Sequence, residues 1–197
     1  MRNFNVTAVT VETEKIAINK NESAVRLKIP RSYTDEAITR CESNLRRVLN
    51  LKYAYTKVSV EIKSDNICDL GFGEIESRDL VKALSGCKQA YILGVTIGID
   101  ADRLISRLSI TSPAESFITD ALASAAAESL CDYADNLLRG TGEKPFRYAP
   151  GYGDMPLSYQ PAVLEALNAD YTLGISLNSS SLMTPMKSIT SIMGIKE

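Results

Sequence analysis

The sequence predicts a mixed α+β fold: a largely antiparallel, twisted sheet packed with helices, one of them long and central. Segments with the alternating pattern of strands and segments with the 3.6-residue pattern of helices interleave without a strict strand–helix–strand repeat. A nearly continuous apolar run at residues 90–99 indicates a strand covered on both faces, and the pattern from Pro113 to Arg139 indicates the long helix. At 197 residues the whole chain, 1–197, is expected to form one domain.

The first fifty residues predict two strands and a helix. Alternation over residues 6–18 predicts a strand, and "VRLKI" at 25–29 predicts a second, shorter one. From Thr34 to about Leu51, apolar residues recur at helical spacing, which predicts a surface helix lying over the sheet. These apolar residues are Ile38, Cys41, Leu45, Val48 and Leu49.

The middle of the chain predicts two more strands with a short helix between them. Residues 56–63 alternate as a strand does, and Ser77 as N-cap and Gly86 as a stop mark the helix. The apolar run at 90–99 follows as the central strand. Its two glycines indicate close packing or a close approach of the backbone.

The best-marked helix begins at "SPAE". Ser112 is expected as its N-cap and Pro113 as its first residue, while Glu115 completes a capping box. The helix should stop at Gly140, on the order of 40 Å from its start at about 1.5 Å per residue. Beside its apolar stripe, the opposite face carries a single charge, Glu128, so the helix is expected to be central and partly sandwiched. Glu128 is then either an ordinary, partly exposed glutamate or an acid that faces a ligand.

The remaining elements complete the α+β pattern. Residues 101–108 predict a helix before the long one, and residues 157–169 predict a short helix after it. Residues 171–177 and 187–195 predict two closing strands, joined by a polar loop.

The composition excludes several classes of function. The chain is 45% hydrophobic and 23% charged with a net charge of −2, so it lacks the basic surplus typical of nucleic-acid binding. Because it contains no histidine, a Ser-His-Asp triad, a histidine-ligated zinc and a histidine ligand to a corrinoid or haem are excluded. We therefore predict no catalytic residue and no metal ligand. In a group transfer, such a chain is expected to bind and position a cofactor that is already reactive.

The N-terminus and the cysteines indicate location and redox state. "MRNFNVTAVTVETEK" lacks an apolar signal-peptide core, and no run approaches the roughly 20 apolar residues of a membrane span. The protein is therefore expected to be cytoplasmic, with no membrane partner. The cysteines lie 19 or more positions apart, which predicts buried, reduced thiols rather than a zinc site or a redox pair.

"PFRYAPGYGDMP", residues 145–156, concentrates prolines, glycines, tyrosines and one arginine between two helical segments. "APGY" predicts a type II turn, in which Pro150 fixes φ and Gly151 supplies a positive φ. Arg147 is the fork-shaped donor that suits a planar carboxylate, and the tyrosines offer ring faces and hydroxyl groups. From these residues alone, a plain turn and a ligand-binding loop both remain open.

"RYAPGYGDMP" resembles the Arg-x-x-x-Gly-Tyr signature of the activation domain of cobalamin-dependent methionine synthase, which reads Arg-Pro-Ala-Pro-Gly-Tyr-Pro. Other segments resemble the same family in the same order: "SRDLVKALSGCKQAYILGVTIGIDADRLI", "AAAESLCDYAD" and the serine-rich loop before the last strand. The resemblance covers roughly residues 55–195, and residues 1–54 precede it as the N-terminal part of the same domain.

The resemblance implies binding of S-adenosylmethionine. In the family, the motif arginine and the backbone around its alanine, glycine and tyrosine hold this cofactor, which implies the same role here for Arg147, Ala149, Gly151 and Tyr152. A glutamate of the long helix also belongs to the family site, and Glu128 is the matching position. A sulfonium methyl group is already electrophilic and needs no acid or base, which agrees with a chain without histidine.

The resemblance also implies partners. In the full synthase, the domain caps the corrinoid, cobalt(II) is reduced by a flavodoxin-like one-electron donor, and the methyl group passes from S-adenosylmethionine to cobalt. The corrinoid-binding motif contains a histidine and so has no counterpart here, which leaves cobalamin to a partner protein. The expected function is a reactivation subunit that acts in trans, as a component of a methionine synthase lacking its own activation domain. The alternative is an activator, or an S-adenosylmethionine-sensing binding module, for another corrinoid methyltransferase.

The chain departs from the family at two points of the expected site. The family acid for the cofactor's amino group lies near the N-terminus and has no secure counterpart here. Asp154 adds a charge that the family motif lacks. We expect Asp154 to change the ligand contacts and to distinguish this chain from its larger relatives.

Overall fold

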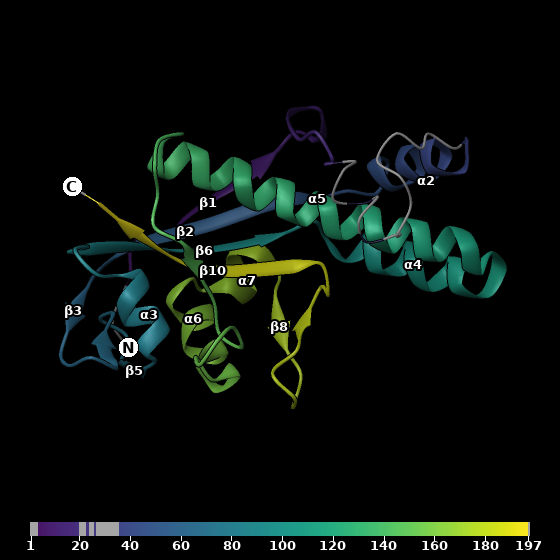
Figure 1. Ribbon diagram of the computed structural model, residues 1–197. Helices are drawn as coiled ribbons and strands as arrows, with labels where there is room; N and C mark the ends of the chain where they lie inside the picture. Colours follow the sequence, from purple (N-terminus) through teal and green to yellow (C-terminus); the bar gives the residue numbers. More distant parts are fainter. Residues whose placement is uncertain (1–3, 20–22, 24–25, 27–35, 197) are drawn as a thin grey trace.

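A computed structural model, which describes residues 4–19, 23, 26 and 36–196, shows a five-stranded sheet with helices on both faces (Figure 1). Every neighbouring pair of strands in this sheet runs antiparallel. The order across the sheet is β1 (Thr7–Val11), β2 (Leu51–Ser59), β6 (Gln89–Thr96), β10 (Ser188–Ile195) and β7 (Arg147–Tyr148). The predicted α+β class with a largely antiparallel sheet is confirmed.

Helices cover the sheet from two sides. In Figure 1, α5 crosses one face, while α3, α6 and α7 lie against the other. α4 and α2 lie beside α5, towards and beyond one end of the sheet. The helices are α2 (Glu36–Arg46), α3 (Arg78–Ala83), α4 (Ile99–Thr111), α5 (Pro113–Arg139), α6 (Gln160–Ala166) and α7 (Ala169–Leu173). Two hydrophobic cores fill the space between helices and sheet, one on each face.

β6 lies at the centre of the sheet, and its side chains alternate between the two cores. Leu93 and Val95 pack into the core under α5, whereas Ala90 and Ile92 pack into the core under α6 and α7. A Cβ atom at Gly94 would come within 2.9 Å of two leucine side chains of the second core, so a larger residue here would require these side chains to shift. The predicted central strand with a closely packed glycine is confirmed at Gly94, but the strand ends before Gly98, which instead precedes α4 as its N-cap.

α5 is buried on both sides over its middle turns. Leu122 and Leu130 are fully buried, and Ala121 and Cys131, on the opposite face, are only 5% and 1% exposed. The ends of the helix are more open, since Leu137 is 59% exposed. The predicted central, sandwiched helix is therefore confirmed for the part that crosses the sheet.

The capping box predicted at the start of α5 is not formed. Ser112 is the N-cap, but in the part of the chain that the structure describes its side chain makes no capping hydrogen bond. Glu115 instead accepts hydrogen bonds from Arg40 of α2, at 2.6 Å from Nη2 and 3.2 Å from Nε. A charged guanidinium is a stronger partner for the carboxylate than a neutral backbone N–H, which explains the difference.

α2 packs against α5, so the prediction that it lies over the sheet is wrong. Its buried residues, Cys41 and Leu45, join the core beneath α5. The helix ends at Arg46, earlier than predicted, because β2 already begins at Leu51 and the chain must turn between them. Residues 34 and 35, where the helix was predicted to begin, lie outside the described residues.

The N-terminal strand is shorter than predicted. β1 ends at Val11, and a 3-10 turn, η1 (Thr13–Lys15), replaces the remainder of the alternating segment. The strand predicted at residues 25–29 lies, apart from Arg26, outside the described residues. The strand predicted at 56–63 begins earlier, at Leu51, and ends at Ser59.

The strand predicted at residues 171–177 is wrong over its first half, which belongs to α7. Asn168 with φ 48° precedes this helix and Gly174 with φ 69° ends it. Ala169 and Leu173 are buried, whereas Tyr171, midway between them, is 87% exposed; in a strand all three side chains would lie on the same face. Only β8 (Ser176–Leu177) remains extended, and it pairs with β9 (Met183–Thr184) outside the main sheet.

A small lobe carries α3. Its strands β3 (Glu61–Ile62), β4 (Ile67–Asp69) and β5 (Glu74–Glu76) form a separate three-stranded sheet. Ser77 caps α3 as predicted, because its hydroxyl oxygen accepts a hydrogen bond of 2.9 Å from the amide of Leu80.

None of the helices in the described ranges has the length and apolar character that crossing a bilayer requires.

Candidate ligand-binding site

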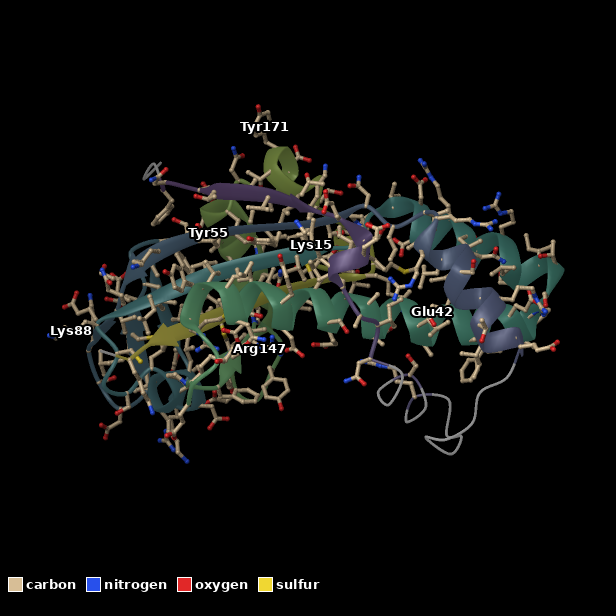
Figure 2. All side chains as sticks on the ribbon, turned by 90° about the horizontal axis from the view of Figure 1, so that it is seen from above. Lys15, Glu42, Tyr55, Lys88, Arg147 and Tyr171 are labelled. Atoms are coloured by element: carbon tan, nitrogen blue, oxygen red, sulfur yellow. The ribbon has the colours of Figure 1, made fainter. Side chains whose placement is uncertain are left out.

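A cleft of about 440 Å³ opens where α5, β7 and β10 meet. Four of the five residues that the sequence predicts as cofactor contacts line it: Glu128, Arg147, Ala149 and Tyr152. Figure 2 shows Arg147 beside α5. The other lining residues are Cys131, Asp132, Asp135, Arg139, Lys144, Pro145, Phe146, Tyr148, Ile189, Thr190 and Ser191. We call this space the Arg147 cleft.

Short β7 fixes the position of Arg147 at the edge of the sheet. Arg147 and Tyr148 pair with Met193 and Ile192 of β10, so the backbone on both sides of the guanidinium-bearing residue is held. Tyr148 is 5% exposed and joins the core on the other face of the sheet. Because side chains alternate along a strand, burying Tyr148 on that face directs Arg147 towards α5.

The guanidinium of Arg147 is only partly paired. Its Nη2 atom lies 2.7 Å from Oδ1 of Asp132, whose side chain is 61% exposed. Its Nη1 atom is buried and has no hydrogen-bond partner among the described residues; we call it the open Nη1 group. Burial works to lower the pKa of Arg147, but the acidic groups of Cys131, Asp132 and Asp135 outweigh it and raise the pKa, so the side chain stays cationic. A buried donor without a partner is costly, which favours a ligand acceptor at this place.

Residues 149–152 form the predicted turn after β7. The amide of Tyr152 donates to the carbonyl of Ala149 over 3.1 Å, and Gly151 has φ +84°, as a type II turn requires. The Gly151 amide also donates to the carbonyl of Met155, which is 1% exposed and anchors the loop in the core. Gly151 itself does not line the cleft: it shapes the turn that carries Ala149 and Tyr152 into it.

Three aromatic rings gather beside the cleft. Phe146 and Tyr152 are 59% and 57% exposed, and their ring centroids lie 5.7 Å apart. The ring of Tyr152 also meets the buried ring of Tyr148 edge to face at 5.6 Å. Exposed aromatic faces next to a cationic group suit a ligand with one flat apolar part and one charged part.

The acids of the cleft come from one face of α5. Glu128 and Asp132 are four residues apart and therefore lie one above the other, both lining the cleft. Burial raises the pKa of the neighbouring Cys131 thiol to about 11, so this group is a neutral thiol near pH 7 and not a nucleophile. All four cysteines are free and buried, as the sequence predicts.

The sequence reasoning missed two parts of this cleft. Asp132, the ion-pair partner of Arg147, was recognisable only by its spacing of one turn from Glu128. Thr190 and Ser191 of β10 line the cleft because β10 pairs with β7. No local sequence motif predicts this pairing. Asp154, predicted to alter ligand contacts, does not line the cleft; its carboxylate accepts hydrogen bonds at the start of α3 instead.

In a search of solved structures, the chain matches a crystal structure of the MetH reactivation domain bound to AdoHcy. The match has a TM-score of 0.73 and covers 98% of this chain and 78% of that chain, at 16% sequence identity. No protein-family model and no curated protein matches the chain in sequence. At this identity the likeness establishes the fold alone, and at that level it confirms the resemblance found in the sequence.

Proposed function

We propose that this protein is a reactivation-type domain that binds S-adenosylmethionine in the Arg147 cleft. The observation that carries the proposal is the open Nη1 group of Arg147, a buried cationic donor that lines a cleft of about 440 Å³. The fold shared with a reactivation domain whose crystal structure contains AdoHcy supports the same ligand class.

The residues of the cleft fit a zwitterionic nucleoside ligand. The guanidinium of Arg147 suits the ligand's carboxylate, because its planar fork can donate two parallel hydrogen bonds. Glu128 and Asp132 place carboxylates on the same side of the cleft, where they suit the amino group. Ala149 lines the cleft, and the exposed ring of Tyr152 is available to the apolar parts of the nucleoside.

Positioning is the chemical role of these residues. When bound, S-adenosylmethionine supplies an electrophilic sulfonium methyl group, so the protein needs no base and no nucleophile of its own. Arg147 holds the carboxylate end, and the turn at Gly151 sets the distance between that end and Tyr152. The neutral thiol of Cys131 does not compete for the methyl group.

The acceptor of the methyl group is proposed to lie on another protein. A corrinoid-binding methionine synthase that lacks its own activation domain is the partner we propose, with a flavodoxin-like or other one-electron donor as reductant. The exposure of Phe146 and Tyr152 beside the cleft supports access by such a partner. Cobalamin enters this scheme only through the partner protein.

Calorimetry tests the ligand. S-adenosylmethionine should bind the wild type, and Arg147→Ala should weaken binding by at least about thirtyfold, since two charge-assisted hydrogen bonds are lost. Arg147→Lys, which keeps the charge but not the fork, should lie between the two. Arg103→Ala is the matched control, because Arg103 is an exposed arginine paired with Asp100 on α4. A wild type that does not bind would overturn the proposal.

A turnover assay tests the role. The assay contains an inactivated methionine synthase that lacks its own activation domain, together with reductant and S-adenosylmethionine. The synthase should regain activity when the wild-type protein is added and not when Arg147→Ala is added. Binding without reactivation would favour a sensor or an activator of another corrinoid methyltransferase.

A further inference from the structure

Asp154 belongs to the loop that follows β7, eight residues after Phe146. Its carboxylate lies at the start of α3. It accepts hydrogen bonds from the hydroxyl of Ser77 and from the backbone amides of Arg78, at 2.8 Å, and Asp79, at 3.4 Å. These amides belong to the first turn of the helix and have no partner within the helix itself. Asp154 therefore completes the cap that Ser77 begins, from a segment 76 positions away in the sequence.

A second contact joins the same two segments. The hydroxyl of Tyr148 donates to Oδ2 of Asp79 over 3.2 Å. Between these two contacts lies Gly153, where a Cβ atom would come within 1.9 Å of the Tyr148 hydroxyl and 2.8 Å of the Asp79 carboxylate. The backbone thus approaches α3 as closely as glycine allows. We call these two contacts the α3 clasp: Asp154 on the amides of α3, and Tyr148 on Asp79.

The α3 clasp encloses the part of the loop that lines the Arg147 cleft. Tyr148 and Asp154 bracket the type II turn, so Ala149 and Tyr152 lie between two points that are fixed to α3. Directly after this interval, the Met155 amide donates back to the Tyr152 carbonyl over 3.1 Å. The ring of Tyr152 rests edge to face on Tyr148, the residue that makes the second contact. Holding α3 therefore holds the backbone and the ring that a ligand would touch.

Asp154 is placed to support the loop and not to bind the ligand. Oδ1 accepts from Ser77 and Asp79, and Oδ2 accepts from Arg78, so both carboxylate oxygens are engaged with α3. The residue is not among those that line the Arg147 cleft. The charge that sets this chain apart from the family motif is directed towards the small lobe.

We propose that Asp154 is a positioning residue, which through the α3 clasp holds Ala149 and Tyr152 in the geometry that binds the ligand. The inference rests on the proposed function, since it concerns the affinity of the same cleft. A mobile loop would have to be ordered when the ligand binds, and fixing it beforehand removes that cost. The family motif has no acid here, so the clasp would be this chain's own way of fixing the loop.

Two measurements on Asp154→Ala test the clasp and its consequence. Amide hydrogen exchange of the free protein should show faster exchange at Gly151 and Met155, whose amides are hydrogen-bonded inside the loop. Calorimetry should show S-adenosylmethionine affinity lowered about fivefold, because the released loop must then be ordered when the ligand binds. Asp154→Asn, which keeps an acceptor oxygen and loses the charge, should give an intermediate affinity.

The matched control is Asp100→Ala, because Asp100 is an exposed acid of the first turn of α4, away from the cleft. It should leave both readouts unchanged. If the wild type binds and Asp154→Ala binds equally well, the positioning role is overturned and the proposed function stands. If exchange at Gly151 and Met155 is unaffected by Asp154→Ala, the clasp does not hold the loop and the inference is wrong. If the wild type does not bind, the proposed function is overturned, and the positioning role with it.

Discussion

Arg139 and Arg147 line the same cleft and use their guanidinium groups in opposite ways. The side chain of Arg139 is 4% exposed: its Nε and Nη2 atoms donate to both carboxylate oxygens of Asp135, at 2.5 and 2.8 Å. Its Nη1 atom donates to the carbonyls of Pro145 and Gly194. Arg147, by contrast, has one exposed acid on Nη2 and the open Nη1 group. The difference separates an arginine whose donors are satisfied within the fold from one that has a donor left for the proposed ligand.

The environment of the two acids makes the same distinction. Asp135 is buried with Arg139, and the Nζ atom of Lys144 lies 3.4 Å from Oδ2 of Asp135. These contacts hold both ends of the connection between α5 and β7. Asp132 is 61% exposed and can leave Arg147 without losing its solvation. A ligand carboxylate therefore competes with a weakly held acid at Arg147.

The largest expected effect is that of Arg139→Ala on stability. It leaves Asp135 buried without a countercharge and two backbone carbonyls without their donor. The free energy of unfolding should fall by about 3–5 kcal/mol, the usual cost of breaking a buried ion pair by removing one partner. Urea unfolding followed by circular dichroism measures it, with Arg103→Ala as the exposed control. A loss below about 1 kcal/mol would remove the distinction between the two arginines.

Arg147→Ala should separate binding from stability. Its affinity for S-adenosylmethionine should fall by at least about thirtyfold, whereas the free energy of unfolding should change by about 1 kcal/mol or less, since the ion-pair partner is exposed. Both quantities are measured on the same preparation, by calorimetry and urea unfolding. A stability loss as large as that of Arg139→Ala would assign Arg147 to the fold instead.

Acid should weaken the Arg139 pair in a defined pH range. Burial works to raise the pKa of Asp135, but the hydrogen bond and charge of Arg139 outweigh it and lower the pKa. A carboxyl whose pKa is lower in the folded state stabilises the protein above its unfolded pKa, about 3.9, and loses this contribution as the pH falls through the folded value.

The difference in unfolding free energy between the wild type and Asp135→Asn should thus stay constant from pH 7 to about pH 5 and shrink below about pH 4. Each pH unit by which folding lowers the pKa of Asp135 corresponds to about 1.4 kcal/mol of unfolding free energy. Urea titrations at successive pH values measure this difference, in which the other carboxyl groups cancel. A difference that grew in acid would contradict the assignment.

The smallest effect is expected for Asp132→Asn. Because Asp132 is 61% exposed, its pair with Arg147 should contribute no more than about 0.5 kcal/mol to stability. A double-mutant cycle with Arg147→Ala isolates this term. A coupling energy of several kcal/mol would mean that Arg147 is structural after all, and that the two arginines do not differ in kind.

Part of the candidate site was predictable because its signals are local. Pro150 and Gly151 impose φ values on their own residues, so the turn follows from two adjacent letters. The resemblance to a family motif then singled out Arg147, Ala149 and Tyr152, which do line one cleft. Glu128 lines the same cleft because α5 forms with the helical periodicity that its sequence predicts.

The errors occurred where a distant partner decided the outcome. Glu115 left its capping box because Arg40, on another helix, offers a stronger hydrogen bond. The segment around Tyr171 has the composition of a strand, yet it folds as a helix, a conformation that buries Ala169 and Leu173 under the sheet while Tyr171 stays exposed. Figure 2 shows Tyr171 itself projecting outwards from α7.

The class of fold, the central strand β6, the long helix α5, the α3 cap at Ser77 and the turn at Gly151 follow from local patterns of residues. Each depends on periodicity or on the φ preference of single residues, which are properties of neighbours in the chain. Three features follow from the packing of distant elements instead: Asp135 pairs with Arg139, Arg147 keeps the open Nη1 group, and Asp154 caps α3. Such pairings depend on distances between elements and on burial, because a charge interacts strongly only with partners within a few ångströms in a place that water does not screen.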